Sequence, residues 1–380
     1  MTVAAVVVTI VAAVLLAKPW DGGRTVLRSP GRPEQVRSVS VDLSVVTDPA
    51  TDWSALSHRL DVAGANAVFL NAGRVEFTAF DWAAHPDAAA SPGTDHLARA
   101  ARALRDGDGW EPREIGLIVD AFVPEWIKAD PTIAGVAPDG RLARYRASAS
   151  QLAHGEVGER IIDLVADLGA RYEPDQIAIT ELFLDLYSFG DDDLALFRQM
   201  TGRTDWPRDA DGLPDDRSPI VGAWRAEVIA DLLRRARAAL DEVNDGRGAD
   251  IDLVMEARVD WKAPTVGPLV AGHDYETLLD AADRLVLWTY LSGGRPGTEA
   301  GELARALAAA GYDMSRFTFS LGLWDRTAEA PSGRITTEVL EQALDEAQRA
   351  GVRDLDVTPL TLMTDADWAA LARVWRPTTQ

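Results

Sequence analysis

Acidic residues stand at the ends of several apolar runs of the chain, and their carboxyl groups are candidates for acid and base catalysis. Glu181 ends the run Gln-Ile-Ala-Ile-Thr-Glu, and Glu256 ends Ile-Asp-Leu-Val-Met-Glu. Asp120 follows Ile-Gly-Leu-Ile-Val, Asp325 follows Phe-Ser-Leu-Gly-Leu-Trp, and Asp42 lies within an earlier run. Burying an unpaired carboxylate costs several kcal/mol, so acids at these positions need a structural or a functional reason.

Two facing carboxylates, one protonated and one ionised, are the usual equipment for cleaving a glycosidic bond. We expect Glu181 to be the proton donor, with Glu256 or Asp325 as the second carboxylate. Each assignment has a structural alternative, such as an ion pair between Glu181 and an arginine like Arg258. We also take Asp42 and Asp120 as candidate substrate-binding residues, although Asp42 equally suits a hydrogen bond inside the fold.

Aromatic residues gather near the same ends. They are Phe122, Trp126, Phe183, Tyr187, Trp261, Trp288, Tyr290 and Trp324. Flat rings stack on the apolar faces of sugars, although a single tryptophan can equally belong to the core. We therefore take Trp126, Trp261, Trp288, Tyr290 and Trp324 as further candidate substrate-binding residues.

The elements that must position these side chains are eight short apolar runs, nearly all followed by a helix-like stretch. The runs are Ser38–Val46, Asn66–Leu70, Ile115–Val119, Gln176–Glu181, Ile251–Glu256, Arg284–Tyr290, Arg316–Leu323 and Arg353–Thr358. Near-continuous apolar strands are typical of a parallel sheet that is covered on both faces. Eight strand–helix units predict a single (β/α)₈ TIM barrel over residues 37–380, with the active site at the carboxyl ends of the strands.

Helical patterns lie between the runs, and long loops follow the second, third and fourth of them. The third of these loops, Asp185–Ser218, is rich in Asp, Gly and Pro, as is typical of a loop that shapes a cleft. The predicted helices are Asp52–Ala63, Asp95–Leu104, Gly155–Ala170, Ala223–Val243, Tyr275–Ala282, Thr298–Ala310 and Thr336–Ala350.

The first residues of the chain carry a different signal. Thr2–Ala17 is an uncharged apolar run bounded by Lys18, and it is short for a membrane span. We expect residues 1–19 to be an uncleaved membrane anchor, with a cleaved signal and a buried core helix as alternatives. Trp20–Val36 then reads as a linker to a barrel on the extracellular side of the cell membrane, or, if the signal is cleaved, to a secreted one.

Composition limits the chemistry that remains. The formal net charge is −22, which argues against nucleic acid as a partner and reflects either solubility or attraction for a cationic polymer. The chain has no cysteine and only five scattered histidines, so thiolate chemistry is excluded and a histidine metal site is not indicated. We expect no metal and no cofactor.

Three segments resemble glycoside-hydrolase-like barrels related to the C-terminal hydrolase domain of bacterial poly-β-1,6-N-acetylglucosamine deacetylases. Asp120-Ala-Phe-Val-Pro-Glu-Trp is similar to that family's strand-3 exit, and Arg171-Tyr-Glu-Pro-Asp-Gln-Ile-Ala-Ile-Thr-Glu to its strand-4 entry. The stretch from His273-Asp-Tyr-Glu to Leu287-Trp-Thr-Tyr-Leu resembles its strand-6 region. The resemblance implies a catalytic acid at Glu181 and a site tyrosine at Tyr290.

The chain also departs from the family's pattern. Leu182 replaces a second acid, and the strand-7 pattern reads Phe319-Ser-Leu-Gly. Pro359 is followed by Leu360 and Thr361 where the family has acidic residues, and the metal-dependent deacetylase domain is absent. Two hypotheses follow: a glycosidase acting on an extracellular polysaccharide, with amino-sugar polysaccharides among the candidates, or a non-catalytic carbohydrate-binding or envelope-organising module on a degenerate hydrolase barrel.

Overall fold

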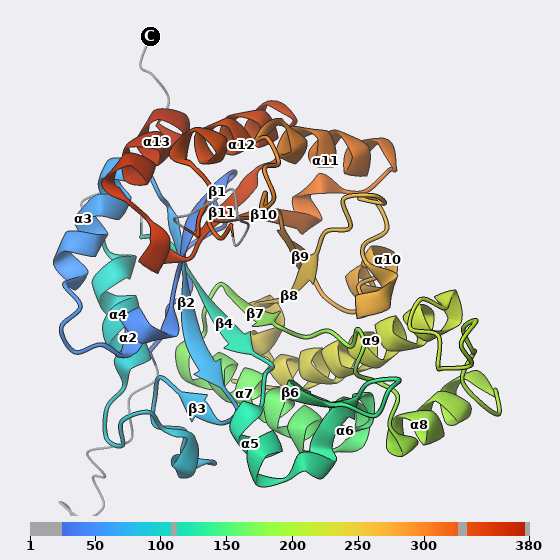
Figure 1. Ribbon diagram of the computed structural model, residues 1–380. Coiled ribbons are helices and arrows are strands. Elements are labelled where there is room, and N and C mark those ends of the chain that lie inside the picture. The colour runs from blue at the N-terminus through green and yellow to red at the C-terminus, as the bar shows by residue number, and fades with distance from the viewer. Residues whose placement is uncertain (1–24, 108–111, 326–332, 377–380) are drawn as a thin grey trace, which may run out of the picture.

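Parallel strands form a closed barrel in the structure of the protein, a computed structural model that describes residues 25–107, 112–325 and 333–376 (Figure 1). The ring closes because β1 pairs with both β11 and β2, with Val39 opposite Val357 on one side and Val68 on the other. The eight barrel strands are β1 Val36–Val41, β2 Ala67–Arg74, β4 Glu114–Asp120, β7 Gln176–Thr180, β8 Asp252–Arg258, β9 Arg284–Trp288, β10 Phe317–Gly322 and β11 Asp354–Thr358. The predicted TIM barrel is confirmed.

Both faces of the strands are buried, which explains why they read as apolar runs. One cluster of side chains fills the inside of the barrel: Val36, Ala67, Phe69, Ile118, Ala178, Val254 and Val286. A much larger cluster lies between the strands and the surrounding helices. The first predicted strand is too long, because β1 ends at Val41 and Leu43–Thr47 forms the short helix α2.

Helices cover the outside of the barrel and mostly match the predicted ones. They are α3 Trp53–Ala63, α4 His96–Arg105, α7 Glu156–Tyr172, α9 Pro219–Asp241, α10 Tyr275–Leu279, α11 Thr298–Ala309, α12 Thr337–Arg349 and α13 Asp365–Trp375. The Asp52 carboxylate caps α3 by accepting a hydrogen bond from the Ala55 amide at 2.9 Å. Gly311 and Gly351 take positive φ angles of 91° just beyond α11 and α12, a conformation that side chains disfavour.

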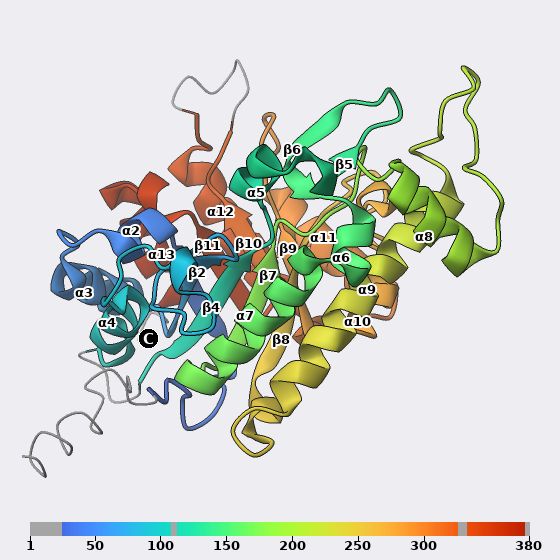
Figure 2. The same ribbon diagram turned by 90° about the horizontal axis from the view of Figure 1, so that it is seen from below.

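The long loops carry further elements that sequence reasoning missed. They are β3 Phe77–Thr78, α5 Pro124–Ala129, β5 Ala134–Val136, β6 Leu142–Ala147, α6 Ala149–His154 and α8 Asp191–Thr201. Short 3₁₀ helices lie at Pro86–Ala88, Pro131–Ile133, Arg247–Asp250, Leu269–Ala271, Met314–Arg316 and Leu360–Leu362. Figure 2 shows the β5–β6 hairpin and α8 at the opposite end of the barrel from the turn between α9 and β8. These insertions therefore stand on the side where the strands end.

The described part of the predicted linker packs against the amino ends of the strands. The Thr25 amide donates to the Arg171 carbonyl at 3.0 Å, Leu27 is buried, and Arg32 pairs with Asp354 at 2.5 Å. The predicted anchor at residues 1–19 lies outside the described residues. Within the described ranges, no helix has the length and apolarity to span a membrane.

The amino end of the barrel is filled by paired charges. The buried Arg284 guanidinium lies 3.0 Å from the Asp252 carboxylate and 3.2 Å from that of Asp354, and it also donates to the Gln176 side chain. Such a network pairs both terminal nitrogens of the buried guanidinium, while its Nε atom has no hydrogen-bond partner among the described residues, and it closes this end of the ring. The opposite, carboxyl end of the strands is where TIM-barrel enzymes carry their active sites.

Candidate active site

A cavity of about 200 Å³ opens among the carboxyl ends of the barrel strands. Its lining consists of Ser40, Val41, Asp42, Asn71, Ile118, Asp120, Thr180, Glu181, Glu256, Trp288, Tyr290, Ser320, Trp324 and Thr358. The structure thus brings together acids and aromatic rings that lie far apart in the sequence. Of the residues predicted for the site, it gathers Asp42, Asp120, Glu181, Glu256, Trp288, Tyr290 and Trp324.

Glu181 follows the last residue of β7 in a left-handed backbone conformation, with φ at 57°. A residue other than glycine seldom takes this conformation, and such strain is concentrated at functional sites. Burial, with smaller contributions from the negative charges of Asp120 and Glu256, raises the pKa of the Glu181 carboxyl from 4.5 to about 7, against the opposing effect of Arg258 and Arg146. Near neutral pH, this carboxyl is therefore divided between its protonated and ionised forms.

The ion pair between Glu181 and Arg258 that we considered does not form. Arg258 instead lies 3.6 Å above the centre of the Phe183 ring and 3.3 Å from the Asp185 carboxylate. Arg146 approaches the other oxygen of Asp185 at 2.7 Å. Among the described residues, Glu181 has no ion-pair partner within 4.0 Å, so its proton can move without the breaking of a salt bridge.

Asp120 ends β4, directly opposite Thr180 in the parallel register. Its Oδ1 atom accepts a hydrogen bond from the Phe122 amide at 2.8 Å. Burial raises the pKa of Asp120 from 3.8 to about 6, while the Phe122 amide and the Arg74 charge oppose the rise. Asp120 therefore ionises at a lower pH than Glu181, and the two carboxyls hold different protonation states between these values.

Glu256 lies in β8 and is held by two donors. One oxygen of its carboxylate, Oε2, accepts from the Thr180 hydroxyl and from the Trp288 indole nitrogen, each at 2.7 Å. Burial raises the pKa of Glu256, and these two hydrogen bonds act in the opposite direction. The two bonds fix the orientation of the carboxyl group relative to the cavity.

A buried carboxyl group that sequence reasoning missed lies beneath the cavity. Asp356 in β11 accepts hydrogen bonds from the hydroxyls of Ser38, Ser40 and Ser320 at 2.8–3.0 Å. Burial raises its pKa from 3.8 to about 7, although the three serines oppose the rise. The signal was present in the sequence as an aspartate inside an apolar strand and two serines at alternate positions of another. Asn71, whose side chain accepts from the Gly73 amide, was also missed.

Aromatic rings form one wall of the cavity. The rings of Trp288 and Tyr290 are stacked, with centroids 5.5 Å apart and an interplanar angle of 6°. The ring centroids of Tyr290 and Trp324 lie 5.4 Å apart. A Cβ atom on Gly322 would collide with the Tyr290 ring, so the glycine makes room for it. This wall offers flat apolar faces beside the carboxyl groups.

Three predicted site residues do not line the cavity. Trp126 packs in α5 with its ring 5.0 Å from the Arg160 guanidinium, and Trp261 lies at the same distance from Arg295. Asp325 is buried and accepts a hydrogen bond from the Gly293 amide at 3.2 Å. Asp42 reaches the rim, where its Oδ2 atom accepts from the Thr361 amide at 3.0 Å.

Nothing in the described ranges is arranged to bind a metal, since no three or more His, Asp or Glu side chains gather suitably there. What the cavity offers is several carboxyl groups with raised pKa values, two hydrogen-bond donors already engaged with Glu256, and an aromatic wall. This equipment suits proton transfer to a ligand with both polar and apolar faces.

Solved structures with the same architecture include glycoside hydrolases. The glycoside hydrolase domain of PgaB (BpsB) from Bordetella bronchiseptica matches with a TM-score of 0.65 and 18% sequence identity, over 90% of this chain and 99% of that domain. Alpha-L-fucosidase isoenzyme 2 from Paenibacillus thiaminolyticus matches at 0.62 and 14% identity, over 90% of this chain and 49% of that one. A beta-galactosidase from Marinomonas ef1 matches at 0.63 and 12%, over 89% and 58%.

These likenesses confirm the glycoside-hydrolase-like TIM barrel that the sequence predicted, and at such low identities they show the fold alone. No protein-family profile matches the chain, and no curated protein matches it in sequence. Activity must therefore be argued from the residues of the cavity.

Proposed function

We propose that the protein is a glycoside hydrolase that acts on an extracellular polysaccharide, including polysaccharides that contain amino sugars. One observation carries the proposal: Glu181 and Asp120 face one cavity with pKa values of about 7 and about 6. A pair of carboxyl groups that differ in this way can supply an acid and a base at the same pH. The sugar would stack on the wall of Trp288, Tyr290 and Trp324.

In the proposed reaction, protonated Glu181 donates its proton to the glycosidic oxygen as the bond to the anomeric carbon breaks. An ionised carboxylate stabilises the positive charge that develops on the sugar, either as nucleophile or as the base that takes a proton from water. Glu256 or Asp325 is the second carboxylate expected from the sequence, and of the two only Glu256 lines the cavity, held in a fixed orientation by its two hydrogen bonds. Asp120 is the stronger candidate, because it ionises before Glu181.

The substrate class and the cellular location extend this proposal. The resemblance in the sequence and the fold of the PgaB domain both support a glycan substrate. The apolar run Thr2–Ala17 supports anchoring at the outer face of the cell membrane, with a secreted form as the alternative. The barrel would then meet polysaccharide outside the cell and need no cofactor for hydrolysis.

The test uses the full-length chain in detergent with β-linked glucosamine oligomers and cell-wall glycans as substrates. Glu181→Gln should reduce turnover by roughly 10²- to 10⁴-fold, the usual contribution of a general acid, with KM little changed. Glu302→Gln is the matched control, because Glu302 is an exposed residue on α11 away from the cavity. Cleavage that survives Glu181→Gln would remove Glu181 from this role.

One observation favours the non-catalytic alternative. The seventh strand of the barrel, β10, presents Ser320 to the cavity rather than an acid. Asp325, which lies beyond the end of β10, does not line the cavity. A barrel that has lost an acid there could still bind sugars on its aromatic wall. Saturable binding of a glycan without release of reducing ends, by wild type and Glu181→Gln alike, would establish this function instead.

A further inference from the structure

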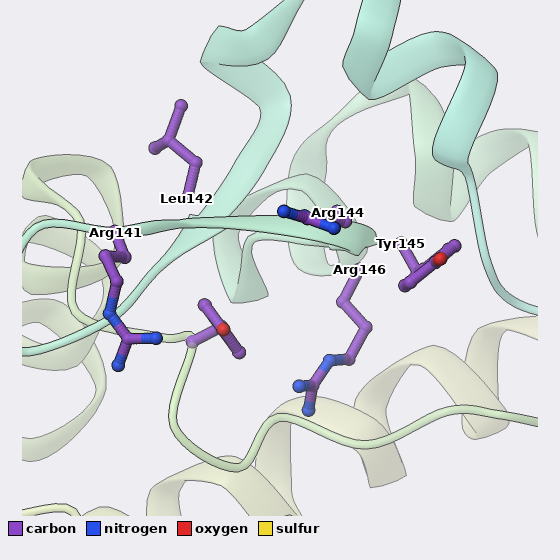
Figure 3. Close-up of a pocket in the computed structure, with 6 residues that line it drawn as sticks. Arg141, Leu142, Arg144, Tyr145 and Arg146 are labelled. Atoms are coloured by element: carbon purple, nitrogen blue, oxygen red, sulfur yellow. The ribbon is translucent and has the colours of Figure 1, made fainter.

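A basic hairpin stands beside the cavity of a strongly acidic protein. The arginine hairpin, defined here as residues 134–147, contains β5 and β6 and carries three arginines against one acidic residue, in a chain of formal charge −22. A hollow of about 380 Å³ lies against it, lined by Arg141, Leu142, Arg144, Tyr145, Arg146 and Tyr187. Figure 3 shows Arg141 and Arg146 on the same side of β6, with Leu142 on the other.

The three arginines differ in what they already bind. Arg146 is fixed by the Asp185 carboxylate at 2.7 Å, and its guanidinium lies 4.7 Å from the ring centre of Tyr187. The Arg141 Nε atom lies 2.6 Å from the Asp139 carboxylate. Arg144 is exposed and has neither a hydrogen bond nor an ion pair with any residue that the structure describes. Its guanidinium fork is therefore available to an anion.

Exposed apolar surface accompanies this free charge. Tyr145 is 54% exposed and Leu142 is 47% exposed, both on β6. Large side chains that are this exposed contribute little to the core, and an exposed apolar patch with an aromatic ring is typical of a binding surface. Both features lie within one short strand.

Aromatic rings connect the hairpin to the cavity. The ring of Tyr145 lies 5.6 Å from that of Phe122, which lies 5.9 Å from Phe183. Phe183 in turn lies 6.3 Å from Trp288, whose ring belongs to the cavity wall. Phe183 itself is buried beneath Arg258 and Arg146, so these contacts fix the hairpin close to the cavity wall.

We propose that the arginine hairpin is a subsite for a carboxylate-bearing sugar of the polysaccharide whose glycosidic bond is cleaved in the cavity. The inference rests on the proposed function and adds the chemical class of the substrate. The guanidinium of Arg144 presents two parallel N–H donors that match a carboxylate, while Tyr145 supplies a stacking face. Because most of the protein surface repels anions, a local positive patch also fixes where an acidic glycan can lie.

The overall negative charge had suggested attraction for a cationic polymer as an alternative to solubility. The arginine hairpin instead indicates attraction for a negatively charged glycan at the place where the glycan would extend from the cavity. Charge located beside the site outweighs charge spread over a distant surface, because ions screen interactions beyond roughly 10 Å.

The test measures binding rather than cleavage, with the full-length Glu181→Gln chain in detergent so that no substrate is consumed. The probes are a hyaluronan hexasaccharide, which alternates glucuronate and N-acetylglucosamine, and the same hexasaccharide with its carboxylates reduced to alcohols. Calorimetry should show tighter binding of the carboxylated form, with an advantage that shrinks at high salt. Adding Arg144→Gln should weaken binding of that form about tenfold, or about 1.4 kcal/mol, with no effect on the reduced form.

Arg305→Gln is the matched control, because Arg305 is an exposed arginine on α11 with no described ion pair. Equal binding of the two hexasaccharides, equal effects of the two arginine substitutions, or no binding of either probe would overturn the subsite. Cleavage of glucosamine oligomers, which carry no carboxylate, with no preference for carboxylated glycans would overturn the subsite while leaving the glycosidase intact. Binding that depends on Arg144, with no cleavage of any glycan, would instead overturn the glycosidase and leave the carboxylate-binding hairpin intact.

Discussion

Replacing Glu181 by glutamine should stabilise the protein at alkaline pH, whatever its substrate. The folded state raises the pKa of this carboxyl from 4.5 to about 7, chiefly by burial and then by the charges of Asp120 and Glu256. A folded state that prefers the protonated form must lose stability when the group ionises. Glutamine has a similar shape and carries no charge, so it removes that loss.

The sign and size follow from linkage. Below about pH 4.5 the group is protonated in both the folded and unfolded states, so its effect on stability is constant. Between about pH 4.5 and 7 the unfolded state has lost a proton that the folded state still holds, so stability falls as pH rises, and the loss is complete once the folded state also ionises above about 7. At 1.36 kcal/mol for each pH unit, a pKa of about 7 instead of 4.5 amounts to at most about 3 to 4 kcal/mol. Glu181→Gln should therefore gain on the order of 1 to 3 kcal/mol over wild type at pH 8, relative to pH 4.

Urea denaturation followed by tryptophan fluorescence measures this difference at pH 4, 6 and 8. Glu302→Gln, on the exposed side of α11, controls for the loss of one carboxylate from an acidic protein. The difference between Glu181→Gln and wild type should grow with pH, whereas that for Glu302→Gln should change little. A pH-independent difference, or a Glu181→Gln variant that loses stability relative to wild type as pH rises, would refute the electrostatic description of the cavity.

Three further outcomes are expected. Turnover should follow a bell-shaped pH profile between about 6 and about 7, since Asp120 must be ionised and Glu181 protonated, and a single-limbed profile would exclude that pairing. Gly322→Ala should lower kcat/KM on glycan substrates, because the added methyl group displaces Tyr290 from the cavity wall, while the circular dichroism spectrum should show an unchanged fold. Unchanged kinetics would show that the Tyr290 ring is not needed. Arg225→Met should lower the free energy of unfolding by about 3 to 5 kcal/mol in urea denaturation, because it removes the buried guanidinium that lies 2.7 Å from the Asp216 carboxylate and leaves that carboxylate without its ion pair. A smaller loss would mean that water solvates the Asp216 carboxylate in the variant.

The barrel strands could be predicted because each is buried on both faces and therefore reads as an apolar run. Their ends were less accurate, since Val45 and Val46 continue the apolar run but belong to α2. The β5–β6 hairpin was missed, because β6 alternates arginines with other residues inside a loop that contains several prolines. A strand outside the core leaves no apolar signal in the sequence.

For the candidate site, the sequence correctly placed residues that stand at the end of a strand. It did not correctly place residues that lie several positions beyond a strand end. Asp120, Glu181 and Glu256 all reach the cavity, since each stands at or near the end of its strand. Trp126 and Trp261 lie a few residues further along, where loop conformation turns them towards arginines. Each residue added beyond a strand brings two more backbone angles that the sequence does not fix.

The sequence by itself determined that parallel strands alternate with helices, and hence that acids at the strand ends share one rim of a ring. Only the tertiary structure decided which of them face one another, that Arg258 pairs with Asp185 rather than Glu181, and that Asp325 lies outside the cavity. The same holds for the protonation of Glu181, because its pKa is set by burial and by charges on other strands. Periodicity is a property of neighbours along the chain, whereas electrostatic interaction depends on distances through space.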